Sequence, residues 1–597
     1  MWKPLGKPIM PSQMIPIGYL GGIMDNQEVA AIFFEVADIL DIQGVAFKPN
    51  AYRRAARSIE ALEEDISKMA SEGRLTDIPG VGESVAKKIQ EIISTGQLSY
   101  LKKLRAQIPE GLLQILSIPD IGPKTAMLLN RELGIENLEQ LKKAAEDHRL
   151  HGIKGFGEKS EEKILQGIKT LESKGSRMLL GEAFPIGNAY VEYLKANVIV
   201  DRVSVGGSLR RGRETVGDID ILVGNDNPGE VMDAFVSYPL VKETLMKGPT
   251  KSSVVLRNGI QVDIRVVEPK SWGAALVYFT GSKDHNVAIR SIGVQMGLKL
   301  NEYGVFERET GKMLAGATEE DVYEALGLHW IPPEIREASG EIEAAKAGKM
   351  PALVEQSDIK GDVHTHTDWS DGVEPMETLF ESAMSRGYEY VAVTDHSQSL
   401  KIANGLSPER LRKQVGALRK AEDKLDGKLS VLAGTEVDIK ADGSLDFPAS
   451  VLKDLDIVIG SVHSRFKMDK SEMTRRITTA IESGMIDILG HPTGRLIGER
   501  DPYQVDIEKV FSAAKSSGVF MEINSFPNRL DLRDAHCRLA GQTGVKVAIG
   551  TDAHRPEQLD FIRFGVITAR RGWLGKESVL NSMGAKRILS HLRKRRT

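Results

Sequence analysis

The spacing of hydrophobic residues predicts helices near the N-terminus and strands farther along the chain. Apolar residues recur at helical intervals from Val29 to Leu40 and from Tyr52 to Ile66, which is typical of amphipathic helices. Later, short apolar runs interrupted by carboxylates at residues 217–223 and 261–267 indicate strands. Beyond residue 360, seven strand-like runs end in polar residues and are separated by helical stretches. The pattern predicts an all-α region, an α+β region and a region of alternating strands and helices.

Length and composition limit the interpretation. A chain of 597 residues is too long for one hydrophobic core, so we expect several domains. The net charge of −4 gives no whole-chain attraction to nucleic acid, so any DNA binding must come from local surfaces. The single cysteine, Cys537, excludes an intrachain disulfide and fits a reducing cytoplasm, where we expect the protein.

The uncharged stretch from Ile9 to Met24 contains helix-breaking proline and glycine and is too short to span a bilayer, so we expect a disordered extension and no membrane partner.

Two aspartates mark a candidate metal site. Asp218 and Asp220 lie two residues apart in an apolar run, so both side chains point to one face of a strand. The preceding segment, residues 206–212 with the sequence GGSLRRG, brings backbone NH groups close to an anion. Ser208, Arg210 and Arg211 add a hydroxyl and guanidinium groups that match phosphate geometry. The alternative, a solvated strand edge, explains the aspartates but not the glycine-rich segment.

A third carboxylate completes the set. Asp263 lies in a second strand-like run, and three carboxylates can hold two divalent ions. Two such ions activate an attacking hydroxyl and stabilise the leaving phosphate in an in-line displacement. The sequence therefore predicts a site where two divalent ions, Mg²⁺ or Mn²⁺, support an in-line displacement at a phosphate.

This pattern resembles the nucleotidyltransferase palm of family X DNA polymerases, the polymerase beta group. The resemblance implies that deoxynucleoside triphosphates are substrates and that Tyr278, Phe279 and Gly281 form the sugar-selecting turn. Two of the implied roles have alternatives. Arg177, an implied nucleotide contact, could instead be a surface residue of a helix, and Tyr278 and Phe279 could instead belong to the hydrophobic core. Lys283 departs from the family, which has an acidic residue there. The implied nucleotide contacts are Arg177, Gly207, Ser208, Arg211, Gly217, Tyr278, Phe279, Gly281 and Asn286, and the implied DNA contacts in this region are Arg265 and Arg290.

Three glycine-containing turns precede the palm, at residues 78–82, 118–124 and 153–159. Each leads into a helical stretch and would present backbone NH groups to a phosphate. The turns look like helix-hairpin-helix motifs, which grip the DNA backbone without reading sequence. The glycines concerned are Gly80, Gly82, Gly122, Gly155 and Gly157.

The first of these regions is also similar to the lyase domain of polymerase beta. Residues 48–53 and 80–88 carry the resemblance, which places Lys48 at DNA and Lys88 as a Schiff-base lysine. Ser84 stands where the family has a second lysine. A phosphate-anchoring surface lysine is therefore the alternative role for Lys88.

The seven strand-like runs of the C-terminal region end in histidines and carboxylates. Buried parallel strands with functional residues at their carboxyl ends are typical of a (β/α) barrel. Imidazole and carboxylate ligands suit zinc, manganese or iron. The candidate ligands are His364, His366, Asp371, His396, Glu436, His463, His491, Asp552 and His554.

This ligand set resembles the PHP phosphoesterase domain, and all nine family ligand positions are filled. The resemblance implies three divalent metals (Mn²⁺, Zn²⁺ or Fe²⁺), with Glu436 as a bridging carboxylate. An alternative is that the barrel is a scaffold whose metals only stabilise the fold.

We therefore predict a multidomain protein with an all-α N-terminal helix-hairpin-helix region, an α+β palm with a thumb, and a C-terminal (β/α)7 PHP barrel. The expected segments are a disordered extension 1–23, a lyase-like domain 24–100, a fingers-type helical domain 101–176, the palm 177–266, the thumb 267–331, a linker 332–357, the barrel 358–580 and a basic tail 581–597.

The combination resembles bacterial and archaeal family X DNA polymerases. It implies short-gap filling in base excision repair, a 3′ to 5′ exonuclease, and abasic-site endonuclease or phosphatase activity in the barrel. We expect gapped or nicked double-stranded DNA as a partner and a monomeric protein. Two further alternatives are a template-independent nucleotidyltransferase and a palm that only binds DNA, leaving the barrel as the sole enzyme.

Overall fold

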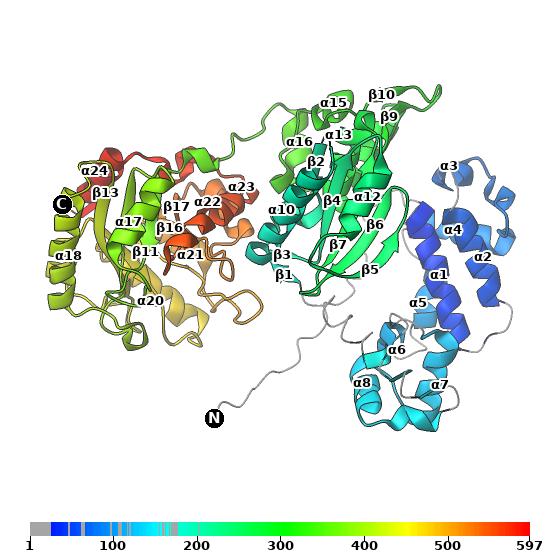
Figure 1. Cartoon of the computed structure of the whole chain (residues 1–597), viewed down its shortest axis with the longest axis horizontal. Coiled ribbons are helices and arrows are strands. Elements are labelled where there is room, and N and C mark those ends of the chain that lie inside the picture. The colour runs from blue at the N-terminus through cyan, green and yellow to red at the C-terminus, as the bar shows by residue number, and fades with distance from the viewer. Residues whose placement is uncertain are drawn as a thin grey trace. The chain divides into compact units, whose positions relative to one another are not determined.

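Figure 1 shows the computed structural model of the whole chain. The residues belong to two compact units. The first contains the chain up to Arg177 together with residues 255–261 and 287–296, and the second contains the rest. The structure describes residues 26–596 except 44, 46–47, 61–65, 96–97, 106–109, 116–117, 119–120, 154–155, 158–159, 162, 166–167, 169–176 and 201. The predicted extension 1–23 lies outside the described residues.

The N-terminal part of the first unit is helical, as the apolar spacing predicts. It has two hydrophobic cores, one formed by side chains between Val29 and Leu104 and the other by side chains between Leu112 and Ile168. The first core ends at Leu104 and the second begins at Leu112. The helices are α1 (Asn26–Ile42), α2 (Lys48–Glu60), α3 (Ile66–Ser71), α4 (Glu83–Thr95), α5 (Ser99–Arg105), α6 (Glu110–Ile115), α7 (Pro123–Leu133) and α8 (Leu138–Glu146), with 3-10 turns η1 (Leu75–Asp77) and η2 (Arg149–Gly152).

The palm is a five-stranded sheet with the strand order β2-β4-β7-β6-β5. β4 and β7 are the two carboxylate-bearing runs, and the order makes them neighbours at the centre of the sheet. The strands are β2 (Arg202–Val205), β4 (Asp218–Gly224), β5 (Val241–Lys247), β6 (Lys251–Leu256) and β7 (Gln261–Val267), with a small pair β1 (Met178–Leu179) and β3 (Thr215–Val216). The helices are α10 (Leu180–Asn197), α11 (Gly207–Arg210), α12 (Pro228–Val236) and α13 (Trp272–Thr280).

The thumb follows with a three-stranded sheet of order β10-β9-β8. Its elements are α14 (Lys283–Gln295), β8 (Leu298–Asn301), β9 (Gly304–Glu307), β10 (Met313–Ala315) and α15 (Glu319–Ala325).

The predicted linker 332–357 needs correction, because its first half is folded against the thumb. The Arg336 side chain is fully buried, and its two terminal nitrogens lie 2.7 and 3.0 Å from the carboxylate of Glu319. Glu341, in α16 (Glu341–Lys346), is buried 2.7 Å from His285 Nδ1. The charged, alanine-rich composition predicted a linker with some helix. α16 agrees with the predicted helix, but the buried ion pairs of Arg336 and Glu341 make this half part of the fold. Two short turns, η4 (Pro333–Ile335) and η5 (Gln356–Asp358), complete the segment.

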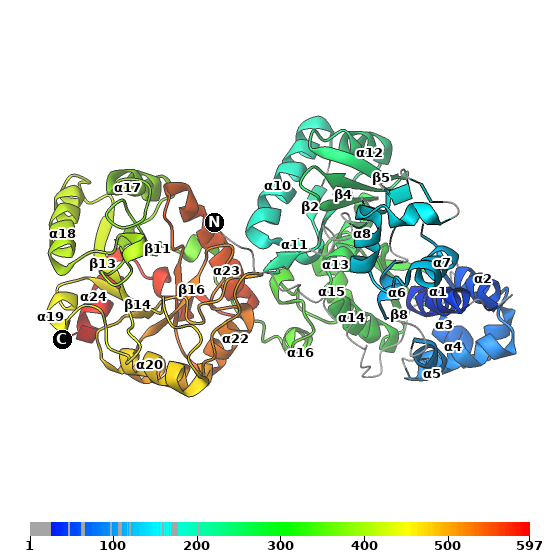
Figure 2. The same ribbon diagram turned by 90° about the horizontal axis from the view of Figure 1, so that it is seen from below.

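The C-terminal region confirms the predicted seven-stranded barrel. Its strands run in sequence order from β11 to β17, all neighbouring pairs are parallel, and a bridge from Thr365 to Ala553 joins the first strand to the last. Helices surround the strands, as Figure 2 shows. The strands are β11 (Gly361–Thr365), β12 (Tyr390–Val393), β13 (Ser430–Asp438), β14 (Ile457–Ser461), β15 (Ile488–Leu489), β16 (Phe520–Asn524) and β17 (Val547–Gly550). The helices are α17 (Met376–Ser385), α18 (Pro408–Asp423), α19 (Ala449–Leu452), α20 (Lys470–Glu482), α21 (Ile507–Ser517), α22 (Asp534–Thr543) and α23 (Ile562–Arg571), with turns η6 (Lys401–Ala403), η7 (Pro556–Phe561), η8 (Lys576–Ser578) and η9 (Leu580–Ser582).

The predicted basic tail 581–597 also needs correction. It contains α24 (Ala585–Arg596), and the side chains of Ile588 and Leu592 are fully buried among the inner residues of the barrel. Burial of an aliphatic side chain of this size stabilises a fold by about 2 kcal/mol. The basic composition obscured the apolar spacing of the helix, which is part of the barrel. None of the helices within the described residues is long and apolar enough to cross a membrane.

Candidate metal centres

The palm sheet brings the three predicted aspartates together. Asp218 and Asp220 share one face of β4, and Asp263 projects from the neighbouring strand β7. One carboxylate oxygen from each residue lies within 4.8 Å of the others. This spacing suits a site for divalent cations.

The charge of Asp220 shows why this cluster favours a cation. Burial raises the pKa of Asp220, the charges of Asp218 and Asp263 raise it further, and the resulting value is about 7 despite the opposite effects of Lys251 and Arg211. Three ionised carboxylates at this spacing repel one another. A divalent ion would relieve the repulsion and keep Asp220 ionised.

The glycine-rich segment lies directly against this cluster. The Gly206 NH donates to the Asp220 carbonyl oxygen at 2.8 Å. Gly207 has a φ of +56°, and a β-carbon there would lie 2.1 Å from Asp220 Oδ2. A side chain at position 207 would therefore displace a metal-facing carboxylate, so the backbone approach requires glycine.

The two arginines of this segment have different surroundings. Both terminal nitrogens of Arg210 bond the buried carboxylate of Glu319, at 2.7 and 2.9 Å, and one also bonds Thr280 Oγ1. Arg210 therefore joins the palm to the thumb, which corrects the expectation that its guanidinium binds phosphate. Arg211 Nη1 donates to the Thr280 carbonyl oxygen at 2.5 Å, and its Nε lies 3.2 Å from Glu337 Oε1. The first bond ties the segment to the end of α13, and the second ties it to the residues that follow η4.

The predicted sugar-selecting turn lies at that same end of α13. Tyr278 and Phe279 are half-buried and pack edge to face, with ring centroids 5.1 Å apart. Asn286 Nδ2 donates to the Tyr278 carbonyl oxygen at 2.7 Å. Gly281 has a φ of +69° and packs close to the Arg211 guanidinium. Five predicted nucleotide contacts therefore form one connected group: Arg211, Tyr278, Phe279, Gly281 and Asn286.

The remaining predicted contacts of the polymerase part lie in varied surroundings. Ser208 and Gly217 are half-buried, and Arg177 is exposed. Arg265 is half-buried on β7, with Nη2 3.4 Å from the Tyr303 hydroxyl, and Arg290 is half-buried on α14.

In the helical unit, most of the predicted phosphate-binding positions are accessible. Gly80 has a φ of +86°, and Gly80, Gly82, Gly122 and Gly157 are exposed. Lys48 is exposed at the first residue of α2. Gly155 lies outside the described residues.

Lys88 lies on α4 beside two aromatic rings. Its Nζ donates to Ser84 Oγ at 3.1 Å and to the Ser84 carbonyl oxygen at 3.2 Å. It also lies 5.9 Å from the ring centroid of Tyr52 and 5.3 Å from that of Tyr100. Ser84 therefore orients the amine. Ser84 is the position at which the resemblance to polymerase beta led us to expect a second lysine.

All nine predicted barrel ligands lie at the carboxyl ends of the strands or just beyond them. They form three overlapping groups in which the ligand atoms lie within 4.8 Å of one another, and His491 Nε2 lies 2.9 Å from Glu436 Oε1. The groups are His366, Asp371, His396 and His554; His364, His366 and Asp552; and His396, Glu436 and His463.

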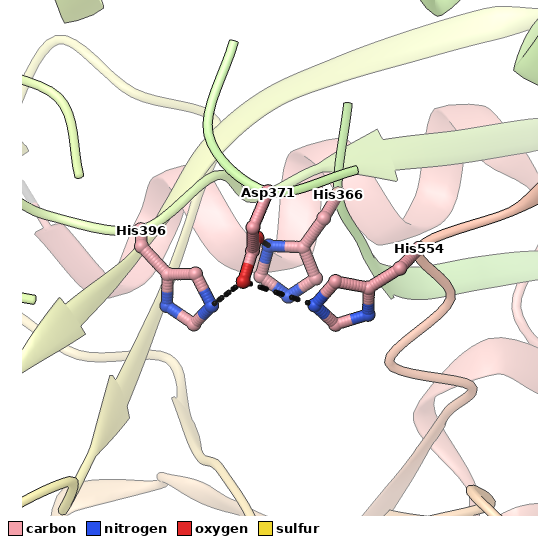
Figure 3. Close-up of side chains that lie close together, drawn as sticks. All are labelled: His366, Asp371, His396 and His554. Carbon is pink, nitrogen blue, oxygen red and sulfur yellow. Dashed lines mark ion pairs between the residues drawn. The ribbon is translucent and has the colours of Figure 1, made fainter. Parts of the chain in front are cut away.

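The first group is drawn in Figure 3. Asp371 Oδ2 points between two imidazoles, 3.5 Å from His396 Nε2 and 3.4 Å from His554 Nε2. The His366 ring stacks on the rings of His396 and His554, with centroids 4.4 Å away in each case. The nitrogens converge on Asp371 from three different strand ends.

Glu436 occupies the centre of the barrel ligands. Its Oε1 lies 3.3 Å from His463 Nε2, and its Oε2 lies 2.8 Å from His396 Nδ1. A carboxylate whose two oxygens face different imidazoles has the arrangement that a bridging ligand needs.

Neighbouring imidazoles in this site have opposite pKa shifts. Burial lowers the pKa of His366 to about 3, assisted by the charges of His396 and His554. Burial also opposes the charging of His396 and His463, but Glu436 and the nearby aspartates raise their pKa values to about 10 and about 9. Without a metal, protons thus accumulate on some ligands and are excluded from others.

The donor set fits divalent transition metals on two further observations. The buried Nε2 of His364, both ring nitrogens of His366 and Oε2 of Glu436 have no hydrogen-bond partner of good geometry, a costly arrangement unless a cation binds there. His491 and Asp552 also have positive φ values, 25° and 55°. Strained backbone at non-glycine ligands is typical of functional sites.

Sequence reasoning missed the carboxylates behind the ligands. Glu522 Oε1 lies 2.6 Å from His364 Nδ1, and Asp438 Oδ1 lies 2.6 Å from His463 Nδ1. Such contacts fix the tautomer and orientation of a metal-binding imidazole. The sequence did contain a hint of both roles: Glu522 lies in the apolar run that forms the buried strand β16, and Asp438 follows Glu436 by two residues.

Comparisons with known domain families match most of the chain. Residues 24–98 match a helix-hairpin-helix domain, and residues 112–170 match a SAM-like helix-hairpin-helix tandem. Residues 275–337 match the DNA polymerase beta thumb, and residues 362–526 match the PHP domain.

Individual proteins with similar sequences agree with these matches. The DNA polymerase/3′-5′ exonuclease PolX of Bacillus subtilis (strain 168) is 38% identical over 577 residues, which cover 96% of this chain and 100% of the relative. A probable phosphatase of Thermoanaerobacter sp. (strain X514) is 36% identical over 32% of this chain and 78% of its own. DNA polymerase lambda of Rattus norvegicus is 26% identical over 51% of this chain and 54% of its own.

The raised pKa of Asp220 predicts that cation binding in the palm depends on pH. Below about pH 7 an incoming ion must displace the Asp220 proton, so affinity should fall by up to about tenfold per pH unit, and it should level off above pH 7. Mn²⁺ binding followed by electron paramagnetic resonance between pH 5.5 and 8.5 measures this.

Subtracting the Mn²⁺-binding curve of Asp220→Asn from that of wild type gives the contribution of the palm. Asp226→Asn, which changes an exposed aspartate, is the matched control and should bind Mn²⁺ like wild type. A subtracted curve that is flat across this range would contradict the assignment.

The carboxylate behind His364 provides a second prediction. Glu522→Gln keeps the shape of the side chain but removes the charge that orients the imidazole, so metal affinity in the barrel should fall by about 10–100-fold. Competition with a chelator, read by elemental analysis, measures the change. The exposed Glu381→Gln on α17 should leave affinity unchanged, and equal affinities for the two variants would show that Glu522 has no such role.

Proposed function

Because this chain belongs to the family X DNA polymerases with a C-terminal PHP domain, we propose that it fills short gaps in DNA and shortens 3′ ends. Its palm adds nucleotides and its barrel hydrolyses phosphodiester bonds. The observation that carries this proposal is the presence of two separate sets of possible ligands with no residue in common: three clustered aspartates before residue 275, and after residue 360 eight clustered ligands together with His491, which contacts Glu436.

In the palm, Asp218, Asp220 and Asp263 would hold Mg²⁺ or Mn²⁺, and the backbone at Gly207 with the Ser208 hydroxyl would receive the triphosphate. Divalent ions, when bound, activate the attacking oxygen and neutralise the leaving group in both reactions. Tyr278, Phe279 and Gly281 would contact the sugar, and Asn286 positions that turn through the Tyr278 carbonyl. Arg211 fixes the turn against the triphosphate segment.

In the barrel, the nine ligands would hold up to three ions, for which Mn²⁺, Zn²⁺ and Fe²⁺ are the candidates by donor chemistry. Glu436 would bridge two of the ions. Glu522 and Asp438 hold the His364 and His463 rings in orientation. Arg529, 3.4 Å from Asp552 Oδ2, offers positive charge to the phosphate of a bound 3′ end.

We propose gapped or nicked double-stranded DNA and deoxynucleoside triphosphates as the substrates. The exposed glycine turns at Gly80, Gly82, Gly122 and Gly157 support phosphate binding without base contacts. One chain supplies every ligand of both clusters, so neither activity requires a partner subunit, which supports a monomer.

Removal of a 3′ phosphate is a second candidate reaction of the barrel. It is favoured by the similarity of this region to probable phosphatases. The same ligands would serve, because a phosphomonoester and a phosphodiester place similar demands on the metal ligands. Phosphate release from a 3′-phosphorylated primer distinguishes this reaction from nucleotide removal.

The separation of the ligand clusters predicts selective losses. Asp263→Ala should reduce primer extension on a one-nucleotide gap by at least about 10³-fold, because loss of a metal ligand removes several kcal/mol of transition-state stabilisation. Shortening of the 3′ end should persist. The double variant His364→Ala with His366→Ala should lose shortening and keep extension. A labelled primer, incubated with and without deoxynucleotides, measures both activities.

Bound metal should be measured in the same preparations. Extension retained by Asp263→Ala would overturn the palm assignment, and shortening retained by a double-histidine variant that has lost metal would overturn the barrel assignment. A template-independent enzyme would extend an unannealed primer as well as a gapped one.

We further propose that Lys88 forms a Schiff base with a 5′-deoxyribose phosphate. Ser84 Oγ accepts a hydrogen bond from Nζ, and the Tyr52 and Tyr100 rings lie beside the amine and limit its movement. The amine must lose a proton to attack the sugar carbon, and Ser84 is placed to orient it.

Borohydride trapping tests this role for Lys88. Wild type and the neighbouring exposed variant Lys87→Ala should form a covalent adduct with 5′-deoxyribose-phosphate DNA, whereas Lys88→Ala should lose at least about tenfold of the adduct. Equal trapping by both variants would leave Lys88 with a phosphate-anchoring role only.

A further inference from the structure

A third set of possible metal ligands, separate from those of the palm and the barrel, lies in the helical unit near the third glycine-containing motif. His148 and His151 flank the first residues of η2, and Glu161 lies in the helical residues after the turn at Gly157. Their ligand atoms lie within 4.8 Å of one another. The proposed palm and barrel chemistry uses none of these residues.

The geometry of this cluster converges on one atom. Glu161 Oε2 lies 2.8 Å from His148 Nδ1 and 3.1 Å from His151 Nε2. The two imidazoles stack at 5.5 Å with an interplanar angle of 17°, so both rings direct a nitrogen to the same place. Ligands of a tetrahedral zinc ion lie about 3.4 Å apart, given bonds of about 2.0–2.1 Å. Small side-chain movements would therefore let an ion enter.

Burial distinguishes this cluster from a surface group of acids and histidines. The Glu161 side chain is only 2% exposed, whereas those of His148 and His151 are 67% and 44% exposed. Its other oxygen, Oε1, accepts the Leu150 NH at 3.1 Å, which fixes the carboxylate plane. A carboxylate removed from water requires adjacent positive charge or hydrogen bonds. A divalent ion would supply that charge, and its open positions would face solvent.

We propose that His148, His151 and Glu161 bind a divalent transition metal, with Zn²⁺ as the natural probe for a His₂Glu donor set. In the sequence, His151 precedes the third glycine-containing motif and Glu161 follows it, so the ion would link described residues on both sides of that motif. His148 has a φ of +54°, and its ring stacks on that of His151. The ion would therefore restrain the residues that flank a motif proposed to bind DNA phosphate.

Hydrogen exchange of the full-length protein, read by mass spectrometry, tests the site locally. In wild type, Zn²⁺ added after chelator treatment should slow exchange at least about threefold in peptides spanning 148–161, because a bound ligand suppresses local opening. Elemental analysis should count one more ion in wild type than in His151→Ala. The exposed His329→Ala, outside every cluster, should match wild type.

The variant His151→Lys places a cation beside Glu161 but does not provide the imidazole. Its exchange in chelator should equal that of wild type, and the effect of Zn²⁺ should be absent. Equal zinc content and equal zinc-dependent protection in wild type and His151→Lys would overturn the proposal and leave the cluster as a set of hydrogen bonds.

Discussion

Titratable groups held close together are the constraint on which both candidate active sites depend. In the palm, burial and two neighbouring carboxylates raise the pKa of Asp220 to about 7. In the barrel, the pKa of His366 falls to about 3 while that of the adjacent His396 rises to about 10. No flexible segment would keep such groups in contact, because each could reduce its energy by turning toward water. A rigid sheet is therefore needed: the palm ligands lie on central strands, and the barrel ligands lie at or just beyond the ends of strands that close into a barrel.

The same constraint explains the backbone next to the ligands. Gly207 has no side chain to displace Asp220, and Asp552 and His491 have positive φ values that are unfavourable for these residues. Behind the imidazoles, Glu522 and Asp438 hold rings whose other nitrogens face the site. These features cost stability in a metal-free protein, and they are useful only if cations bind. The residues next to the ligands, such as Gly207, Glu522 and Asp438, are therefore arranged for cation binding as the ligands themselves are.

The sequence predicted those parts of the molecule that are local in pattern. Alternation placed Asp218 and Asp220 on one face, and repeated strand ends predicted the seven-stranded barrel, which the structure confirms. Features that depend on distant partners could not be predicted. Arg210 looked like a phosphate ligand because nothing near it reveals its pairing with Glu319, 109 residues away. Similarly, the burial of Arg336 and Leu592 depends on surfaces that only the folded chain creates. Charge-rich composition was misleading in both segments.

The three ligand sets differ in how far along the chain their members are separated, and this difference affects how each depends on the fold. His364 and His554 belong to opposite ends of the barrel sequence, so their convergence requires all the strands between them. The palm aspartates require only that β4 and β7 pair. His148 and Glu161 are 13 residues apart, and the entropy of closing so short a segment is small. A metal at the helical turn could therefore bind while the rest of the chain is still unfolded, whereas metals in the barrel can bind only after the barrel has closed. If so, metal supply during folding would affect the helical turn first, and the barrel ions would stabilise an already folded domain rather than direct its folding.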